Sequence, residues 1–491
     1  MQKKGPDSMA KDNKNSTLKN MTWKFAERIS AQMVSFVVSI ILARLLDPAD
    51  YGTIAIINVF IAFANVFVSD GLGSALIQKK DADDLDFSSV LFFNIGMSII
   101  LYSFLFFAAP YISAFYGNDY EVLVPTLRVM GLRLIVAAIN SVQQAYVSRK
   151  MIFRKFFLAT LLGTIISAVV GIVMAYNGFG VWALVAQYLT NTTIDTIVLL
   201  VSLHYYPRLK FSFERVRCLL GFGFASLGSS LLITSYVRIR DLVIGKIYSS
   251  SDLAYYNRAS QFPELFMTNI NASISAVIFP RLSRAQDDKP KVMELMKSFI
   301  RLSTYILTPL LVGLAAVAET LVLVLLTEKW LPCVVLLQLL CLNHIFRPMH
   351  TANLQGLRAI GRSDIVFKLE IVKKTIELIS LLFVMRISVK AIVINMVVMS
   401  SVFTIVNAYP VNKLLNYPLK EQFIDVIPPL IMSSIMYGVV FVFNYLNINN
   451  YAKLCIQIII GIIVYVGLSI LTKNKEFKEV LSIAKGLISK R

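Results

Sequence analysis

The sequence predicts an all-α, polytopic membrane protein with fourteen transmembrane helices. The first observation behind this prediction is composition: of 491 residues, 57% are hydrophobic and only 16% are charged, whereas about a quarter of an average soluble chain is charged. The second is a set of long apolar runs, and the third is a one-sided distribution of Lys and Arg. Because so apolar a chain cannot hide its surface in one aqueous core, we expect a lipid bilayer to be its solvent.

Fourteen apolar runs lie between polar breaks of the chain. A helix needs about 20 mainly apolar residues to cross the hydrocarbon core, and runs of this kind occur at 22–43, 52–69, 88–109, 122–146, 156–176, 180–203, 219–245, 259–280, 300–317, 331–351, 364–385, 391–410, 423–446 and 451–472. The fourth, seventh and eighth runs carry charges, and the start of the tenth is blurred by the apolar run Leu321–Leu326. Each run is expected to be one membrane-spanning helix.

A weak internal repeat divides these helices into two sets of six. SALIQ at Ser74–Gln78 is echoed by SAVIF at Ser275–Phe279, and repeats in transporters indicate two lobes around a central site. The expected organisation is a cytosolic tail (1–20), an N-lobe with helices 1–6 (21–205), a C-lobe with helices 7–12 (216–411), helices 13–14 (423–472) and a basic cytosolic tail (473–491). Six is an even number, so both lobes keep the same orientation in the membrane.

The positive charges predict the orientation of the helices. Lys and Arg accumulate in short cytosolic loops. With the N-terminus inside, the cytosolic segments hold 35 of the 48 Lys and Arg residues, the opposite loops hold 7, and 6 lie within the spans. Both termini are therefore expected in the cytosol, and topology rather than nucleic-acid binding explains the net charge of +19.

Several spans carry polar residues on one face, which turns that face toward protein or water. We expect the stripes to line one aqueous cavity, with Arg28 on the first helix, Arg133, Asn140 and Gln144 on the fourth, Asp195 on the sixth, Arg238 on the seventh and Glu264 on the eighth. Hydrogen bonding between helices would also explain many of the uncharged members. An arginine at the centre of a spanning helix costs about 2.5–3.5 kcal/mol even on the scale derived from membrane insertion, which gives the lowest values. This cost favours a cavity role for the arginines, although Arg238 could instead pair with Asp241.

The eleventh helix carries four charges on one side: Glu370, Lys373, Lys374 and Glu377. Their spacing allows two ion pairs between residues four apart. The alternative is a cationic face, from Lys373 and Lys374, for an anionic ligand. Both interpretations stay open at this point.

Motifs of soluble enzymes are absent from the sequence. It has no Walker A motif, no GxGxxG after a strand and no HExxH, and its histidines and cysteines follow no metal-ligand spacing. We expect neither a cofactor, nor a metal, nor catalytic residues.

Five stretches resemble the polysaccharide-transporter branch of the multidrug/oligosaccharidyl-lipid/polysaccharide exporter superfamily, the Wzx-type flippases. They are ARLLDPADYGTIAI (Ala43–Ile56), QQAYVSRKMIFRK (Gln143–Lys155), NGFGVWALVAQ (Asn177–Gln187), RDLVIGKIYSSSDLAYYNRA (Arg240–Ala259) and FPRLSR (Phe279–Arg284). The resemblance covers the first twelve spans in order. It departs in AYYNRA, where Ala254 stands in place of the usual Gly.

The resemblance implies a multi-pass protein of the bacterial inner membrane whose two six-helix lobes form a V. It implies transport of an undecaprenyl-pyrophosphate-linked oligosaccharide from the cytosolic to the periplasmic leaflet by alternating access, for surface polysaccharides such as lipopolysaccharide or exopolysaccharide. The implied partners are that lipid-linked anionic oligosaccharide, membrane lipids, a polysaccharide polymerase and a chain-length regulator. Arginines in a polar cavity independently suit an anionic, amphiphilic cargo.

Other functions stay open at this stage. They are a cation-coupled multidrug antiporter or a peptidoglycan-precursor flippase of the same superfamily, and a membrane polymerase or ligase, for which the outer loops are too short. Lacking a nucleotide motif, the chain is expected to use an ion gradient or the membrane potential, with Asp195 or Glu264 as the coupling carboxylate. The alternative role for each acid is to neutralise an arginine.

Overall fold

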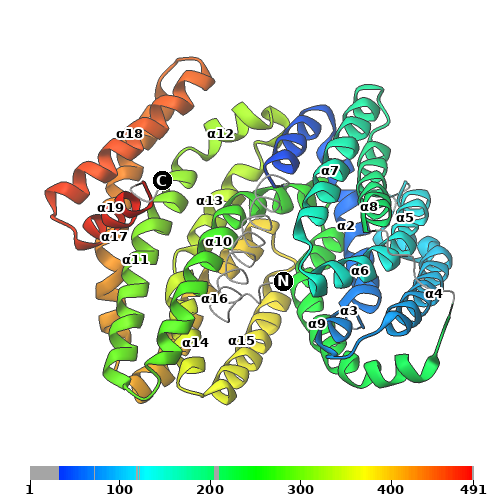
Figure 1. Cartoon of the computed structure of the whole chain (residues 1–491). Coiled ribbons are helices and arrows are strands. Elements are labelled where there is room, and N and C mark those ends of the chain that lie inside the picture. The colour runs from blue at the N-terminus through cyan, green and yellow to red at the C-terminus, as the bar shows by residue number, and fades with distance from the viewer. Residues whose placement is uncertain (1–31, 71, 118–119, 121, 204–209, 489–491) are drawn as a thin grey trace, which may run out of the picture. The chain divides into compact units, whose positions relative to one another are not determined.

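The computed structural model describes residues 32–70, 72–117, 120, 122–203 and 210–488. Every regular element within these ranges is helical, which confirms the predicted all-α class (Figure 1). The chain divides into two compact units, Met1–Ala254 and Tyr255–Arg491. The predicted division into lobes at 21–205 and 216–411 stays a prediction, and in the structure α9 packs against α2, α3 and α4 of the first unit.

The first unit begins, within its described part, with a helix at Gln32–Leu45. Its further elements are α2 (Pro48–Asn65), η1 (Val66–Asp70), α3 (Leu72–Gln78), α4 (Asp84–Tyr116), α5 (Leu123–Gly131), α6 (Arg133–Lys150), α7 (Phe153–Tyr176), α8 (Val181–Leu203), α9 (Phe213–Ile247) and the first turn of α10 (Ser250–Arg284). The element η1 is a π-helix between α2 and α3.

The second unit contains the rest of α10 and the remaining helices. These are α11 (Lys289–Ala316), α12 (Ala318–Leu325), η3 (Glu328–Trp330), α13 (Cys333–His344), α14 (Arg347–Ala359), α15 (Ser363–Val384), α16 (Val389–Leu415), α17 (Leu419–Val442), η4 (Phe443–Tyr445), α18 (Asn450–Leu471) and α19 (Lys475–Ile488). The 3-10 helices η3 and η4 are single turns.

Ten helices in the described part of the chain are long and apolar enough to cross a membrane, or eleven if the bent α9 counts as one span. The protein is thus a polytopic membrane protein, with fewer qualifying spans than the fourteen expected. All fourteen predicted runs nevertheless overlap a helix. Helix α15 carries too many charged residues to qualify as a span, and α10 has a polar middle. Of the helix in the first predicted run, only residues 32–45 are described.

Buried ion pairs tie together one end of the first unit. Asp86, which is fully buried, accepts hydrogen bonds from Lys79 at 2.7 Å and lies 3.5 Å from Arg215. Arg149 donates to the carbonyls of Leu76, Lys79 and Lys80 at the end of α3. Loops 79–86, 149–155 and 210–215 therefore meet at one end, which agrees with the charge rule placing all three on the same side.

A matching arrangement holds α11 to α17 in the second unit. The carboxylate of Asp425, which is 1% exposed, lies 2.6 Å from Arg301 and accepts a hydrogen bond from the Tyr417 hydroxyl at 2.6 Å. Burial raises the pKa of the Tyr417 hydroxyl above its usual range, and the adjacent Asp425 carboxylate adds to that shift. Tyr417 therefore stays neutral and keeps donating to Asp425.

Glycine allows the start of α2 to approach the start of α10. A Cβ atom built on Gly52 would lie 1.8 Å from the carbonyl oxygen of Ser250, far inside van der Waals contact. The backbones touch where a side chain would stand, so this position requires glycine. Gly96 in α4, by contrast, has open space around its Cα.

We predict that Gly52→Ala destabilises the first unit by about 1–3 kcal/mol or more, because a backbone atom cannot move aside as a side-chain end would. Thermal unfolding of the purified protein in detergent measures the effect. Gly96→Ala is the matched control and should leave the melting temperature nearly unchanged. Equal melting temperatures for Gly52→Ala and the unchanged protein would contradict the close approach.

Candidate functional site

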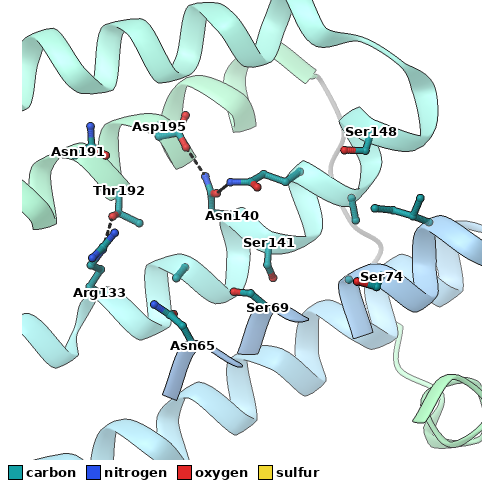
Figure 2. Close-up of a pocket in the computed structure, with 15 residues that line it drawn as sticks. Asn65, Ser69, Ser74, Arg133, Asn140, Ser141, Ser148, Asn191, Thr192 and Asp195 are labelled. Atoms are coloured by element: carbon teal, nitrogen blue, oxygen red, sulfur yellow. Dashed lines mark hydrogen bonds between the residues drawn. The ribbon is translucent and has the colours of Figure 1, made fainter. Parts of the chain in front are cut away.

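A polar cavity of about 490 Å³ lies within the first unit (Figure 2). Five elements contribute its wall: α2, η1, α3, α6 and α8. The lining residues are Asn65, Ser69, Gly73, Ser74, Ile77, Arg133, Ala137, Asn140, Ser141, Gln144, Ala145, Ser148, Asn191, Thr192 and Asp195. Most are polar although all five elements belong to membrane-spanning segments, which is the pattern of an aqueous cavity rather than a lipid-facing surface.

The cavity follows α6 for most of its length. Residues 133, 137, 140, 144 and 148 recur every three or four positions and so lie along one face of the helix. From Arg133 to Ser148 this face spans about 22 Å at 1.5 Å per residue. Arg133 lies near the middle of the span Leu123–Lys150, whereas Ser148 lies beside the loops that the charge rule places in the cytosol.

Arg133 is held by the facing helix α8. Its Nε donates to Thr192 Oγ1 at 2.8 Å, and its guanidinium carbon lies 5.4 Å from the centre of the Tyr188 ring. The Thr192 hydroxyl donates in turn to the Tyr188 carbonyl at 3.1 Å. These contacts engage Nε and the guanidinium face. Among the described residues, the two terminal nitrogens of the fork have no hydrogen-bond acceptor and no carboxylate forms an ion pair with Arg133.

Asp195 stands at the end of a hydrogen-bonded chain of amides. Gln144 Nε2 donates to Asn140 Oδ1 at 2.5 Å, and Asn140 Nδ2 donates to Asp195 Oδ2 at 3.0 Å (Figure 2). The other carboxylate oxygen, Oδ1, is buried and has no hydrogen-bond partner in the described part of the chain. A buried acceptor without a hydrogen bond costs free energy. A bound proton or a ligand would supply the missing bond.

Close packing of α7 fixes the position of α8. A Cβ atom on Gly163 would lie 3.1 Å from the Asn191 carbonyl oxygen, and one on Gly171 would lie 3.1 Å from the Gln187 side chain. Asn191 also donates to Ser167 of α7 at 3.4 Å. Small residues on α7 thus allow α8 to present Thr192 and Asp195 to α6.

The structure brings together four of the predicted site residues: Arg133, Asn140, Gln144 and Asp195. It adds Thr192 and the serines at 74, 141 and 148, which the sequence analysis did not assign to the site. Extending the predicted polar stripe on α6 by one turn would have predicted Ser148. The contact between Arg133 and Thr192 had no signal in the sequence, because it joins residues 59 positions apart.

The other predicted residues lie elsewhere. Arg28 lies outside the described residues. Arg238 on α9 pairs with Asp241 at 3.2 Å, the alternative that its spacing allowed, and it is not among the lining residues of this cavity. In the second unit, Lys373 is nearly buried and pairs with Glu370 at 2.6 Å, Lys374 follows it on α15, and Glu264 is exposed on α10. Their roles in cargo binding stay predictions.

This arrangement defines a membrane transport protein, because a polar cavity within a bundle of spanning helices provides a path for a polar solute. Comparison with known proteins identifies the family. Residues 41–335, more than half of the chain, match the family described as "Polysaccharide biosynthesis protein". The chain therefore belongs to this family, whose members transport rather than catalyse, and the Wzx-type resemblance is confirmed.

Two relatives and one solved structure are similar to the chain. The succinoglycan biosynthesis transport protein ExoT of Rhizobium meliloti (strain 1021) is 26% identical over 358 residues, or 72% of each chain. The lipopolysaccharide biosynthesis protein WzxC of Escherichia coli (strain K12) is 24% identical over 359 residues, or 73% of each. A structure described as lipid II flippase MurJ in an inward closed conformation matches with a TM-score of 0.73 and 16% identity, over 93% of this chain and 99% of its own. The last match shows a shared fold.

Proposed function

We propose that this protein flips an undecaprenyl-pyrophosphate-linked oligosaccharide from the cytosolic to the periplasmic leaflet by alternating access, as a step in the synthesis of a surface polysaccharide. The observation that carries the proposal is Arg133, a mid-membrane arginine in a polar cavity that no described carboxylate neutralises. A guanidinium so placed costs about 2.5–3.5 kcal/mol at the centre of a span. An anionic cargo would offset that cost.

The chemistry of the cavity suits the two polar parts of such a cargo. A pyrophosphate offers oxygens for the terminal nitrogens of the Arg133 fork, a geometry that arginine matches with two parallel hydrogen bonds. The amides of Asn140, Gln144 and Asn191 and the neighbouring hydroxyls supply donors and acceptors of the kind that sugars bind. The polyprenyl tail would stay in the bilayer, so the cavity need hold only the headgroup.

The family and the relatives support the class of cargo. ExoT and WzxC carry names from succinoglycan and lipopolysaccharide biosynthesis, and both polymers are surface polysaccharides. We therefore propose a location in the bacterial inner membrane, with a polysaccharide polymerase and a chain-length regulator as functional partners. Arg28, Arg238, Lys373 and Lys374 are proposed as further cationic contacts for the cargo.

Arg133→Ala should lower the flipping rate about ten- to hundredfold, because hydrogen bonds to charged groups contribute about 1.5–3 kcal/mol. The assay follows a fluorescently labelled undecaprenyl-pyrophosphate sugar in proteoliposomes that contain the purified protein. Arg133→Lys should retain part of the rate, since it keeps the charge and loses the fork. Thr192→Val removes the Nε acceptor and the hydrogen bond to the Tyr188 carbonyl but leaves the guanidinium in place, so it should lower the rate less than either Arg133 variant.

Arg128→Gln is the matched control for this experiment. Arg128 lies in the same span, but its Nε donates to the Phe106 carbonyl at 3.2 Å and its guanidinium covers the Phe106 ring at 4.2 Å. Its loss should leave flipping close to normal. Normal flipping by Arg133→Ala, or transport of a cationic dye in place of the labelled lipid, would refute the proposed cargo.

We further propose fourteen spans with both termini in the cytosol. The 35 to 7 division of loop charges supports this topology, as does the meeting of three predicted cytosolic loops at one end of the first unit. Reporter fusions should show Gly117, in the loop after α4, outside the cell and the position after Lys420 inside. A periplasmic signal after Lys420 would break the fourteen-helix topology.

Asp195 is our proposed coupling carboxylate, ahead of Glu264, because it lines the same cavity as Arg133. Cargo that neutralises Arg133 would change the electrostatic field at Asp195. The proton occupancy of Oδ1, which has no hydrogen-bond partner among the described residues, would change with it. Asp195→Asn should therefore abolish the dependence of flipping on an imposed pH gradient while cargo binding persists. Undiminished gradient dependence in both Asp195→Asn and Glu264→Gln would sink the assignment.

A further inference from the structure

The C-terminal helix α19 is fixed to the end of the spanning helix α18 by a short turn. Lys473, with φ of 50°, ends α18 in the left-handed region, and the N–H of Asn474 donates back to the Ser469 carbonyl at 3.1 Å. Asn474 Oδ1 then accepts a hydrogen bond from the N–H of Phe477 at 3.1 Å, which caps the new helix. Only three residues separate the two helices, so α19 must lie where α18 leaves the hydrocarbon.

Helix α19 lies beside α17 and α18 within the second unit (Figure 1). Phe477 and Val480, three residues apart on the same face, pack against a hydrophobic cluster that includes Tyr305 and Tyr465. That cluster is itself tied to α18, because the Tyr305 hydroxyl donates to Ser469 Oγ at 2.7 Å. This docked stripe of Phe477 and Val480 sets the rotation of α19 and so determines which residues point away from the protein.

Two further stripes flank the docked one, and they differ in charge. Lys475, Lys478 and Leu481 follow one another at intervals of three, whereas Glu476 and Glu479 form a separate stripe about 100° away. Lys475 and Lys478 are exposed, and Leu481 is 41% exposed beside them. Lys478 thus adjoins the exposed Leu481, whereas Lys475 lies between the two stripes, four residues before Glu479.

The surroundings of this stripe are those of a membrane surface. Leu471, in the last turn of α18, is 79% exposed, as expected of a side chain that contacts hydrocarbon. Lys473, just beyond it, is exposed too. From residue 473 to the end, the sequence holds six Lys and Arg against two Glu. Amphipathic helices with this composition lie in the interfacial plane, with apolar residues in the acyl boundary and lysines among the headgroups.

We propose that Lys473, Lys475, Lys478 and Leu481 form a binding site for anionic phospholipid headgroups, which goes beyond the proposed transport function. The lysines supply the charge, Leu481 enters the acyl region, and the docked stripe anchors this surface to α11 and α18. Anionic lipid in the bilayer would then lock α19 onto the second unit. This links the lipid composition of the membrane to the stability of that unit.

The test is thermal unfolding of the full chain in detergent with added lipid. A ligand that binds only the folded state raises the melting temperature as its concentration rises. Phosphatidylglycerol should raise the melting temperature while phosphatidylcholine does not, and 1 M salt should suppress the rise because it shortens the screening length to about 3 Å. The variant Lys473→Gln/Lys475→Gln/Lys478→Gln should lose most of the rise, and the corresponding Arg variant should keep it.

The control variant removes the same number of charges from another exposed part of the second unit, as Lys289→Gln/Lys291→Gln/Lys420→Gln. It should respond to phosphatidylglycerol like the unchanged protein. A full response by the α19 triple Gln variant, or an equal loss in both triple variants, would overturn the proposal. So would an equal rise with glycerol 3-phosphate, which would indicate a site for free phosphate. None of these readouts uses the cargo, so they are independent of the flipping experiments.

Discussion

The structure depends on one constraint: a polar or charged group within the membrane must find its partner in protein or in water, because hydrocarbon offers none. The buried carboxylates of Asp86 and Asp425 meet it with partly exposed arginine and lysine partners. Arg258 of α10, which is 6% exposed, meets it with Gln261 and the face of Trp330. Arg133 meets it only in part, since Thr192 engages one nitrogen and a polar cavity surrounds the rest.

The cavity wall carries one positive and one negative side chain. Among its lining residues Arg133 and Asp195 are the charged ones, yet they do not form an ion pair with each other, and the amides of Asn140 and Gln144 lead to Asp195. An ion pair would satisfy both groups and remove the reason for a ligand to enter. Separate hydrogen-bond partners, Thr192 for Arg133 and Asn140 for Asp195, keep each charge available to its own ligand, the proposed cargo phosphate or a proton.

The sequence was sufficient to place the long apolar helices, because spanning helices are long apolar runs and each of the fourteen runs overlaps a helix. It also found the polar stripe on α6, since Arg133, Asn140 and Gln144 follow helical periodicity. It did not predict α19, which lies in the expected basic tail. What it could not supply were contacts between distant segments, such as Arg133 with Thr192 or Arg149 with the end of α3. Local spacing predicted the pair Arg238–Asp241 but could not choose between it and a cargo role, because both fit a spacing of three.

The π-helix η1 has a consequence for how this family can vary. A π-helical turn holds about one residue more than an α-helical turn, and such segments often occur at functional sites. Here η1 joins Asn65 and Ser69 to Gly73 and Ser74, all on the cavity wall. Regular α-helical geometry over 66–70 with every residue kept would turn everything downstream by about 100°, taking Ser74 off the wall. A change from π- to α-helical geometry in this segment would thus reshape the cavity more than most substitutions do, and it is a route by which relatives of equal length could diverge in the solute they accept.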